Sequence, residues 1–346
     1  MGAGRITKAR LFVTAALLAP IAGAIVLWVA LTGRDSRDAF ADSRPPPDLA
    51  ERFYPPEGWA WGLIQAGDGP VQRYGVGGPP SAPRADVLIL PDYGESAETW
   101  FETARDLIAT GDAVWVLEGV GQGGSARLTG RRDLGELKSF DPDVASVQAV
   151  IQTVIRPAPG RPLVILGQGV GALAAARAVE TGATPAGLVL SAPRCDRALA
   201  GGALVFLRLG AYRAGGAWVR SGPDDFAVRR THDRWRGAIT HVWQIANPDL
   251  RLGGESLDWQ AALLDLQQKT EPAAARIQTP TLLLDADHGP PCLVPAHTER
   301  HALPGADPAF ELESDRWRMP WLSAVERFIS SVIPEGAQRS PGTSDM

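Results

Sequence analysis

A glycine-rich turn directly after a short apolar run is the first place in the chain where chemistry is expected. Gly167-Gln168-Gly169-Val170-Gly171 follows the run that ends at Leu166, and an alanine-rich, helix-forming stretch comes after it. A strand, a tight turn and a small-residue helix are the setting of the G-x-S-x-G motif, which exposes a nucleophilic serine. The central position here is Gly169, which has no side chain to attack a carbonyl. The pattern therefore predicts a nucleophile elbow without its nucleophile.

Three other side chains could supply a reactive oxygen near this turn. Asp92 follows the apolar run ending at Leu90, and a carboxylate can act as a nucleophile or as a base. Ser125 and Ser191 could each supply a hydroxyl, although Ser191 is expected to be structural. Asp92 is the best placed, but no positioned histidine partner is visible in the sequence, which favours a solvated loop residue or the remnant of a lost site.

One histidine with two neighbouring carboxylates could be read as a metal site. His288 lies close to Asp285 and Asp287, and imidazole and carboxylate groups can bind zinc. Their spacing fits no zinc template, and the prolines that follow Gly289 predict an irregular turn. We expect no metal and no cofactor.

Two further pairs of residues leave questions open. His297 and His301 are four residues apart and are expected to share a solvated helix face. Cys195 and Cys292 are too few for a disulfide framework or a cysteine-rich zinc site, and the sequence does not decide whether they pair.

The elements that must position these residues alternate between apolar strands and longer helical stretches. Runs this apolar and without alternation are typical of strands buried on both faces, joined by crossover helices. The sequence therefore predicts an α/β fold with a doubly wound, mainly parallel sheet. Between Leu190 and Thr281 the strand rhythm stops, which predicts an inserted, mostly helical lid at about residues 195–270. The expected strands are residues 86–90, 113–117, 162–166, 186–190 and 281–284.

The N-terminal region carries an uncharged apolar run, Leu11–Thr32, that is long enough to cross a hydrocarbon core of about 30 Å as a helix. The alternative is a cleaved signal peptide, because Ala39-Phe40-Ala41 resembles a cleavage site. Three basic residues precede the run and two follow it, which favours a cytoplasmic N-terminus. We therefore expect a single-pass protein of the bacterial inner or plasma membrane, with its globular domain on the periplasmic or extracytoplasmic side.

The expected domain organisation follows from these segments. Residues 1–10 form a cytoplasmic N-terminus, 11–32 a transmembrane helix, 33–50 a linker, 51–333 the globular domain and 334–346 a disordered tail. The composition, 45% hydrophobic and 21% charged, is that of an ordinary globular protein. A net charge of -5 excludes a general nucleic-acid binder, since no basic excess is available to neutralise phosphates.

Taken together, the motifs make the chain similar to an α/β-hydrolase of the lysophospholipase and monoacylglycerol-lipase branch, over roughly residues 52–330. The elbow at Gly169 is the first matching segment, and the segments together are far more specific than any one of them. The other matching segments are Phe53 through Trp61 with Asp68-Gly69, the oxyanion-hole segment Leu88 to Glu95, the G-H-G-x-S-like turn Gly121 to Ser125, and Asn247 to Gly254 with Trp259 in the lid. The resemblance implies an α/β-hydrolase fold with a helical lid, and monoacyl esters or lipids as the substrate class.

The departures from the family pattern fall on its catalytic positions. Gly169 replaces the nucleophile, and Pro91-Asp92 replaces the His-Gly before the oxyanion donor, where a carboxylate would repel a developing oxyanion. The acid position falls near His288 or Gly289, with Asp285 and Asp287 as close alternatives, and the base position at Pro308 or near Arg316. A lost nucleophile or base costs a triad enzyme about a million-fold in rate, or ~8 kcal/mol. The candidate ligand pocket that the resemblance implies is Asp92, Tyr93, Gln122, Gln168, Gly169 and Val170.

These observations predict a membrane-anchored pseudoenzyme, a catalytically inactive hydrolase-like subunit, scaffold or lipid-binding module of a membrane complex. The expected partners are the membrane through residues 11–32, a membrane protein, and a lipid or other hydrophobic ligand. The alternative is a lysophospholipase or esterase with a non-standard active site. A third hypothesis is a sensor whose lid closes over a lipid without turnover.

Overall fold

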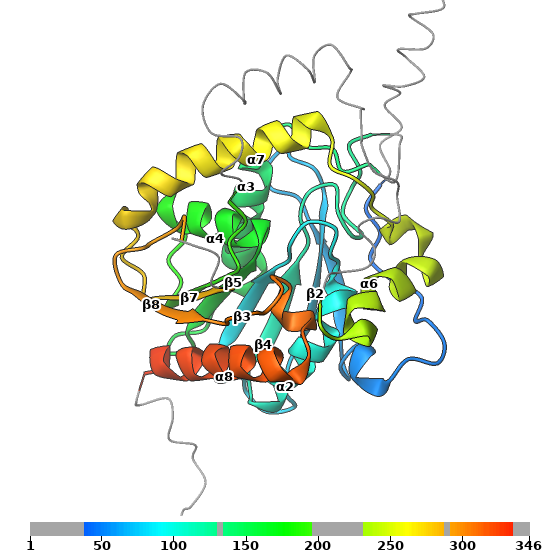
Figure 1. Cartoon of the computed structure of the whole chain (residues 1–346), viewed down its shortest axis with the longest axis horizontal. Helices are drawn as coiled ribbons and strands as arrows, with labels where there is room; N and C mark the ends of the chain where they lie inside the picture. The colour runs from blue at the N-terminus through cyan, green and yellow to red at the C-terminus, as the bar shows by residue number, and fades with distance from the viewer. Residues whose placement is uncertain (1–37, 130–133, 196–230, 287–290, 335–346) are drawn as a thin grey trace, which may run out of the picture.

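The computed structural model describes residues 38–129, 134–195, 231–286 and 291–334 (Figure 1). Eight strands form one sheet in the order β1-β2-β4-β3-β5-β6-β7-β8. The pairs β1–β2 and β2–β4 are antiparallel, and every other neighbouring pair is parallel. The strands are β1 (Ala60–Ile64), β2 (Gln72–Gly77), β3 (Asp86–Leu90), β4 (Ala113–Leu117), β5 (Leu163–Gln168), β6 (Gly187–Ser191), β7 (Thr281–Asp285) and β8 (Thr298–Ala302).

The central strands are buried on both faces, and this explains their unbroken apolar sequences. In β3, Leu88 and Leu90 belong to one hydrophobic cluster, whereas Val87 and Ile89 belong to another on the opposite side of the sheet. This division follows from the two-residue period of strand side chains. The chain thus builds two cores, each closed by its own layer of helices.

The helices cover the two faces of the sheet unevenly (Figure 1). Residues of α2 and α8 contribute to the cluster on one face, and residues of α3, α4 and α7 to the cluster on the other. Helix α6 packs separately, through Ile239 and Trp243, in a third cluster with Phe101. The helices are α2 (Phe101–Ala109), α3 (Asp141–Val150), α4 (Val170–Glu180), α6 (Arg234–Ala246), α7 (Leu257–Thr270) and α8 (Asp315–Val332).

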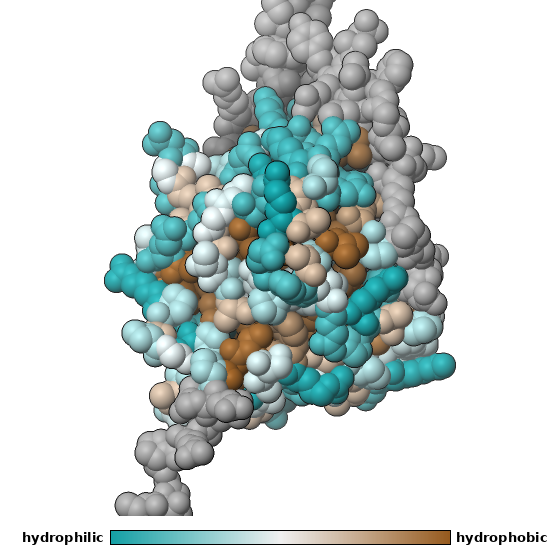
Figure 2. Space-filling view, turned by 90° about the vertical axis from the view of Figure 1, so that its left-hand side faces the viewer, coloured by the Kyte–Doolittle hydropathy of each residue, from teal (hydrophilic) through white to brown (hydrophobic). Residues whose placement is uncertain are grey.

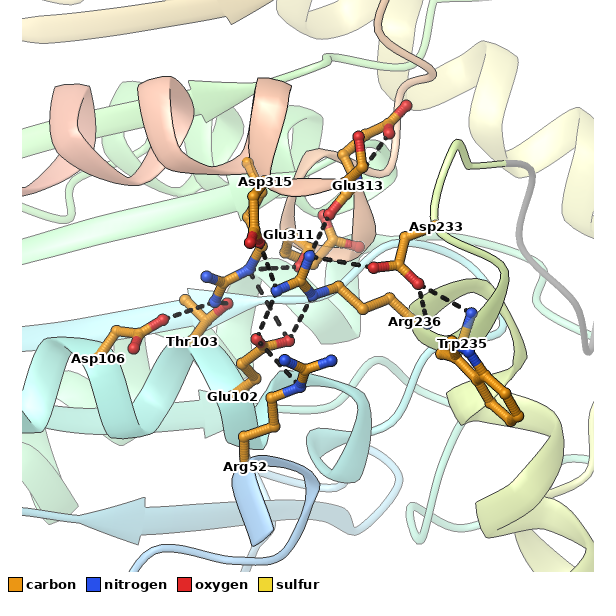
Figure 3. A network of polar contacts seen from close by, with 12 residues as sticks. Arg52, Glu102, Thr103, Asp106, Asp233, Trp235, Arg236, Glu311, Glu313 and Asp315 are labelled. Atoms are coloured by element: carbon orange, nitrogen blue, oxygen red, sulfur yellow. Dashed lines mark hydrogen bonds and ion pairs between the residues drawn. The ribbon is translucent and has the colours of Figure 1, made fainter. Parts of the chain in front are cut away.

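An ion-pair network fixes α6 to the main body (Figure 3). The buried Arg236 guanidinium of α6 makes two hydrogen bonds of 2.8 Å to Glu102 of α2 and one of 2.8 Å to Asp315 of α8. Two parallel N–H···O bonds between a guanidinium and a carboxylate define both distance and orientation. We call this network the α6 clamp, defined by Arg236, Glu102 and Asp315.

The five strands expected from the sequence are all present, within two residues at each end. The sequence analysis missed β1, β2 and β8. Strands β1 and β2 have glycine interruptions, and β8, with the sequence Thr-Glu-Arg-His-Ala, is an exposed edge strand rather than an apolar run. His297 and His301 therefore lie next to and within a strand, and the expected shared helix face is wrong.

The sheet edge at β8 is hydrophilic. Figure 2 shows the side of the molecule on which β8 lies in Figure 1, with apolar patches separated by hydrophilic side chains. Within β8, Glu299 and Arg300 are exposed. Charged residues on an edge strand oppose pairing with another chain.

Several expectations fall outside the described residues. The expected cytoplasmic N-terminus (1–10) and transmembrane helix (11–32) are among them, as are the first part of the lid and, apart from Pro334, the expected tail (334–346). Among residues 38–129, 134–195, 231–286 and 291–334, no helix combines the length and apolar character needed to cross a bilayer. Residues 38–50 of the expected linker contact the domain: Phe40 N–H donates to Gly124 O, and Asn247 exchanges two hydrogen bonds with the Arg44 backbone.

Candidate functional site

The elbow lies where β5 passes directly into α4 through Gly169. This residue has φ +56° and ψ -113°, a left-handed backbone conformation that favours glycine. Its N–H donates to Ser191 O (3.0 Å), and its carbonyl accepts from Arg194 N–H (3.0 Å). The strand-to-helix turn expected from the sequence is thus present at the carboxyl edge of the sheet, where α/β proteins bind their ligands.

The side chain of Asp92 occupies the place that a nucleophile would need. A Cβ atom built on Gly169 would lie 2.2 Å from both Cγ and Oδ1 of Asp92. The same Oδ1 accepts the Val170 N–H at 2.9 Å. A serine at position 169 is therefore incompatible with Asp92 in its present position.

The Val170 N–H is the donor that such an elbow normally offers to an oxyanion. In α/β-hydrolases the oxyanion hole uses the N–H of the residue after the nucleophile and one from the loop after β3. Because the Asp92 carboxylate already accepts the first of these, an anionic group of the protein lies where negative charge would develop in ester hydrolysis. The largest electrostatic contribution to catalysis by this mechanism is thereby opposed.

The turn that carries Asp92 is held by one carboxyl side chain, that of Glu95, and one amide side chain, that of Gln122. The Asp92 N–H donates to Glu95 Oε2 at 2.9 Å, and the Gly94 N–H donates to Gln122 Oε1 at 2.7 Å. Glu95 Oε2 also accepts the indole N–H of Trp100 at 3.1 Å. The sequence analysis did not predict a role for Glu95, although an acid three residues after Asp92 in a glycine-containing turn is a usable signal.

The two positions that the resemblance implied for the base, Pro308 and the neighbourhood of Arg316, lie in different places. Gln168 Nε2 donates to Pro308 O at 2.6 Å, which places Pro308 beside the elbow. Arg316 lies in α8, with its guanidinium over Trp317. A proline cannot take a proton from a nucleophile, so this position has no base.

The histidines that the structure describes pair with other groups or belong to other elements. His301 pairs with Glu299 in β8 at 2.6 Å, and His232 pairs with Glu313 at 2.8 Å. His241 belongs to α6, and His297 lies just before β8. His288 and Gly289, the expected acid position, and the nearby Asp287 lie outside the described residues.

The other candidate side chains from the sequence do not converge on the elbow. Asp285 accepts from Arg300 at 2.7 Å. Ser125 Oγ accepts the Arg73 N–H at 3.0 Å, and Ser191 Oγ accepts the indole N–H of Trp321 at 3.0 Å. Both serines are buried, so Ser191 has the structural role that we expected and Ser125 has one too.

Tyr93 anchors the lid and does not open into a pocket. Its ring lies edge-on to Trp259 of α7 at 4.6 Å, and its hydroxyl donates to Gly253 O at 2.8 Å. Only 2% of its surface is exposed. Of the six expected pocket residues, Asp92, Gly169 and Val170 are in direct contact, Gln122 and Gln168 support them, and Tyr93 is part of the core.

A disulfide closes the base of the lid beside the elbow. Cys195 pairs with Cys292, which joins the chain after β6 to the chain after β7. The preceding residue, Arg194, bonds to the elbow through its backbone and to Glu255 through its guanidinium at 3.0 Å. The pairing that the sequence left open is therefore resolved, and it ties the lid to the carboxyl edge.

A second group of potential ligand atoms lies next to Pro308. Atoms of His232, Asp307 and Glu313 fall within 4.8 Å of one another. Burial raises the pKa of Glu313, but hydrogen bonds from His232 and from three backbone N–H groups outweigh it and hold that pKa below its usual value. These bonds hold the chain before α6 against the chain before α8. The residues that make them are not those of the His288 group that the sequence suggested.

Comparison with protein families matches residues 81–301, more than half of the chain, to the family described as serine aminopeptidase, S33. The fold and the elbow define an α/β-hydrolase of the lipase and lysophospholipase type, and the chain belongs to this family. The resemblance inferred from the sequence is confirmed.

Curated relatives and solved structures agree with this assignment. The chain is 29% identical over 223 residues to lysophospholipase L2 of Escherichia coli K12, a match that covers 58% of the chain and 62% of the relative, less than two thirds of its length. A soluble variant of the Saccharomyces cerevisiae monoglyceride lipase has a TM-score of 0.63 at 16% identity, covering 84% of this chain and 99% of that one. A carboxyl esterase of Bacillus coagulans has a TM-score of 0.61 at 15% identity, covering 80% and 99%. These two structural likenesses show the fold alone.

Proposed function

We propose that this protein is a lipase-type α/β-hydrolase in which Gly169 stands at the nucleophile position and the Asp92 carboxylate fills the space beside it, and that it binds a monoacyl lipid without serine-dependent turnover. One observation carries the proposal: the Asp92 carboxylate fills the space beside Gly169 and accepts the Val170 N–H. The backbone of the elbow is intact, but its Val170 N–H donates to the Asp92 carboxylate of the protein itself. Function follows the groups at a site and not the fold that carries them.

The class of ligand comes from the relatives. Proteins named lysophospholipase and monoglyceride lipase share the sequence segment or the fold of this chain. For the present chain we infer the same class, a single acyl chain on a polar headgroup. The expected extracytoplasmic location is part of the proposal, and the Cys195–Cys292 disulfide supports it, because disulfides persist in oxidising compartments.

The family assignment favours a second candidate, hydrolysis that depends on Asp92. In this mechanism Asp92 takes a proton from water and the water oxygen attacks the ester carbonyl. The ester C–O bond then breaks, and Asp92 returns its proton to the leaving alkoxide. The position of the carboxylate at the elbow favours it. Against it, the same carboxylate must release the Val170 N–H before that group can stabilise an oxyanion.

The test compares binding with turnover in the purified full-length protein. Lysophosphatidylcholine, a monoacylglycerol and a short-chain ester are incubated with the protein, with Asp92→Asn and with Asp68→Asn, a control in the exposed loop before β2. Binding of a monoacyl lipid without product release supports the main proposal. Turnover that Asp92→Asn abolishes and Asp68→Asn preserves supports the second candidate, and turnover unaffected by Asp92→Asn would overturn both.

The membrane-related predictions remain proposals with their own test. We propose that residues 11–32 anchor the domain and that a membrane protein binds it as a stoichiometric partner. Carbonate extraction of native membranes should leave the protein in the membrane fraction, and a mild-detergent pull-down should retain the partner. A protein released by carbonate contradicts the anchor, and one that elutes alone contradicts the complex.

A further inference from the structure

One histidine and two carboxylates lie together where the chain before α6 meets the chain before α8. His232 comes from the first of these segments, and Asp307 and Glu313 come from the second. One ligand atom from each of the three residues lies within 4.8 Å of the other two. We call this group the His232 cluster. It offers one nitrogen and two oxygen ligands, and it takes no part in the function proposed above.

The distances within the His232 cluster bracket those of a tetrahedral zinc site. His232 Nδ1 lies 2.8 Å from Glu313 Oε1 and 3.9 Å from Asp307 Oδ2. With bonds of about 2.0–2.2 Å, two ligand atoms of a tetrahedral zinc ion lie roughly 3.3–3.5 Å apart. A shift of about half an ångström at each carboxylate therefore gives both oxygens the separation from Nδ1 that zinc requires.

The surroundings of the cluster orient its ligands before any ion binds. The Glu313 side chain is fully buried, and its Oε1 accepts the Asp307 N–H at 2.8 Å. Its Oε2 accepts the N–H groups of Ser314 and His232 at 2.9 and 3.1 Å. The His232 ring packs on Trp317, with ring centroids 4.2 Å apart. Ligands held in this way by neighbouring groups are typical of metal sites.

The charges of the His232 cluster match those of a divalent cation. Asp307 and Glu313 bring two negative charges, and a neutral imidazole brings none. Among the residues that the structure describes, no lysine or arginine pairs with either carboxylate. Arg236 donates to the Glu313 backbone carbonyl at 2.9 Å, whereas its charge faces the other two members of the α6 clamp (Figure 3).

We propose that the His232 cluster binds a zinc ion through His232 Nδ1, Glu313 Oε1 and Asp307 Oδ2, with water as the fourth ligand. The ion takes the place of the proton that His232 Nδ1 and Glu313 Oε1 share at 2.8 Å. Imidazole nitrogen suits zinc, whereas calcium and magnesium take oxygen ligands. The side chains of His232 and Asp307 are 45% and 27% exposed, so the ion and its water can enter from solvent.

Zinc at this place would join the lid to a segment that reaches the elbow. Asp307 precedes Pro308, whose carbonyl accepts the Gln168 side chain at 2.6 Å. His232 lies two residues before α6, so the ion would fix this helix at its first turn in addition to the α6 clamp. The zinc site goes beyond the proposed function, because it depends neither on Asp92 nor on a bound lipid.

Thermal melting of the tag-free, full-length protein tests the proposal after treatment with EDTA and removal of the chelator. Zinc at about ten times its dissociation constant should raise the melting temperature by about 3–6 °C, and magnesium at the same concentration should not. The shift should vanish in Asp307→Asn, which removes one ligand and keeps the bond between His232 and Glu313. It should persist in His301→Ala. This control is matched because His301 also pairs with a carboxylate, that of Glu299 at 2.6 Å, but belongs to no group of three ligands within the described chain.

Cobalt(II) gives a direct readout that does not depend on stability. One cobalt ion per protein should bind with the strong visible absorption of a four-coordinate site, and zinc should displace it. The absorption should be lost in His232→Ala and in Asp307→Asn and kept in His301→Ala. Equal melting with and without zinc, together with no cobalt absorption, overturns the proposal and leaves an ordinary bond between His232 and Glu313. A metal-dependent shift that survives in both ligand variants also overturns it, because the ion then binds elsewhere.

Discussion

The α6 clamp and the elbow hold buried or half-buried carboxylates in two different ways. At the clamp, Glu102 faces the Arg236 guanidinium through two hydrogen bonds, so charge is opposed by charge (Figure 3). At the elbow, Asp92 accepts the backbone N–H of Val170, and in α3, Asp143 accepts that of Val120. A guanidinium pair joins two elements, whereas a backbone donor fixes the position of a carboxylate without bringing an opposite charge to it.

Breaking the clamp is expected to have the largest effect. Arg236→Ala leaves Glu102 buried without its bidentate partner, and we expect a loss of about 3 kcal/mol in the free energy of unfolding. Arg52 and Arg318 lie farther from Glu102, at 3.6 and 3.9 Å, and compensate only in part. Urea unfolding measures the effect, with the exposed Arg234→Ala as control. Arg236→Met combined with Glu102→Leu should recover most of the loss, and a double variant as unstable as the single one would contradict a purely electrostatic cause.

The pH dependence of stability should separate the backbone-held Asp143 from the clamp. Burial raises its pKa on folding from the usual carboxyl value to about 7, so the folded state keeps a proton that the unfolded state releases. Stability should therefore fall as the pH rises from about 4 to about 7, by on the order of 2–3 kcal/mol. Urea unfolding at a series of pH values measures this slope. Asp143→Asn should flatten it, and an unchanged slope would mean that another group titrates.

Restoring the missing serine should sharpen the contrast at the elbow. Gly169→Ser places a side chain against Asp92 and gives a non-glycine residue a φ of +56°, so we expect a loss of about 1–3 kcal/mol. Adding Asp92→Gly should recover part of it by removing the clash. A fluorophosphonate probe should label neither variant, because Pro308 cannot act as a base; strong labelling of Gly169→Ser alone would contradict this geometry.

An exposed ion pair should have the smallest effect. Arg300 and Asp285 are 2.7 Å apart, but the arginine side chain is 41% exposed. Arg300→Ala should change the free energy of unfolding by less than about 1 kcal/mol, since water and salt screen such pairs. The measurement is the same urea series, and a loss as large as that of Arg236→Ala would mean that burial does not distinguish the two pairs.

The sequence predicted the parallel centre of the fold well because its strands are buried on both faces. It missed β1, β2 and β8, whose glycines or charges interrupt or replace an apolar run. The elbow at Gly169 was predicted from local spacing. The position of Asp92 against Gly169 was not predicted, because that contact joins residues 77 positions apart and depends on packing.

Tertiary structure also decided questions that spacing left open. The bond from Gln168 places Pro308 beside the elbow, which spacing could not predict. The pairing of Cys195 with Cys292 and the grouping of His232 with Asp307 and Glu313 likewise depend on elements brought together by the fold. Residue types at these positions carry no signal by themselves.

The Cys195–Cys292 bond also changes what a cut in the backbone means. The two cysteines are separated by 97 positions, and the intervening chain includes α6, α7 and β7. A protease that cleaves this stretch once yields two fragments that still migrate as one molecule until a reductant is added. After a single cleavage in the lid, the disulfide thus still joins the two parts of the chain that form the sheet.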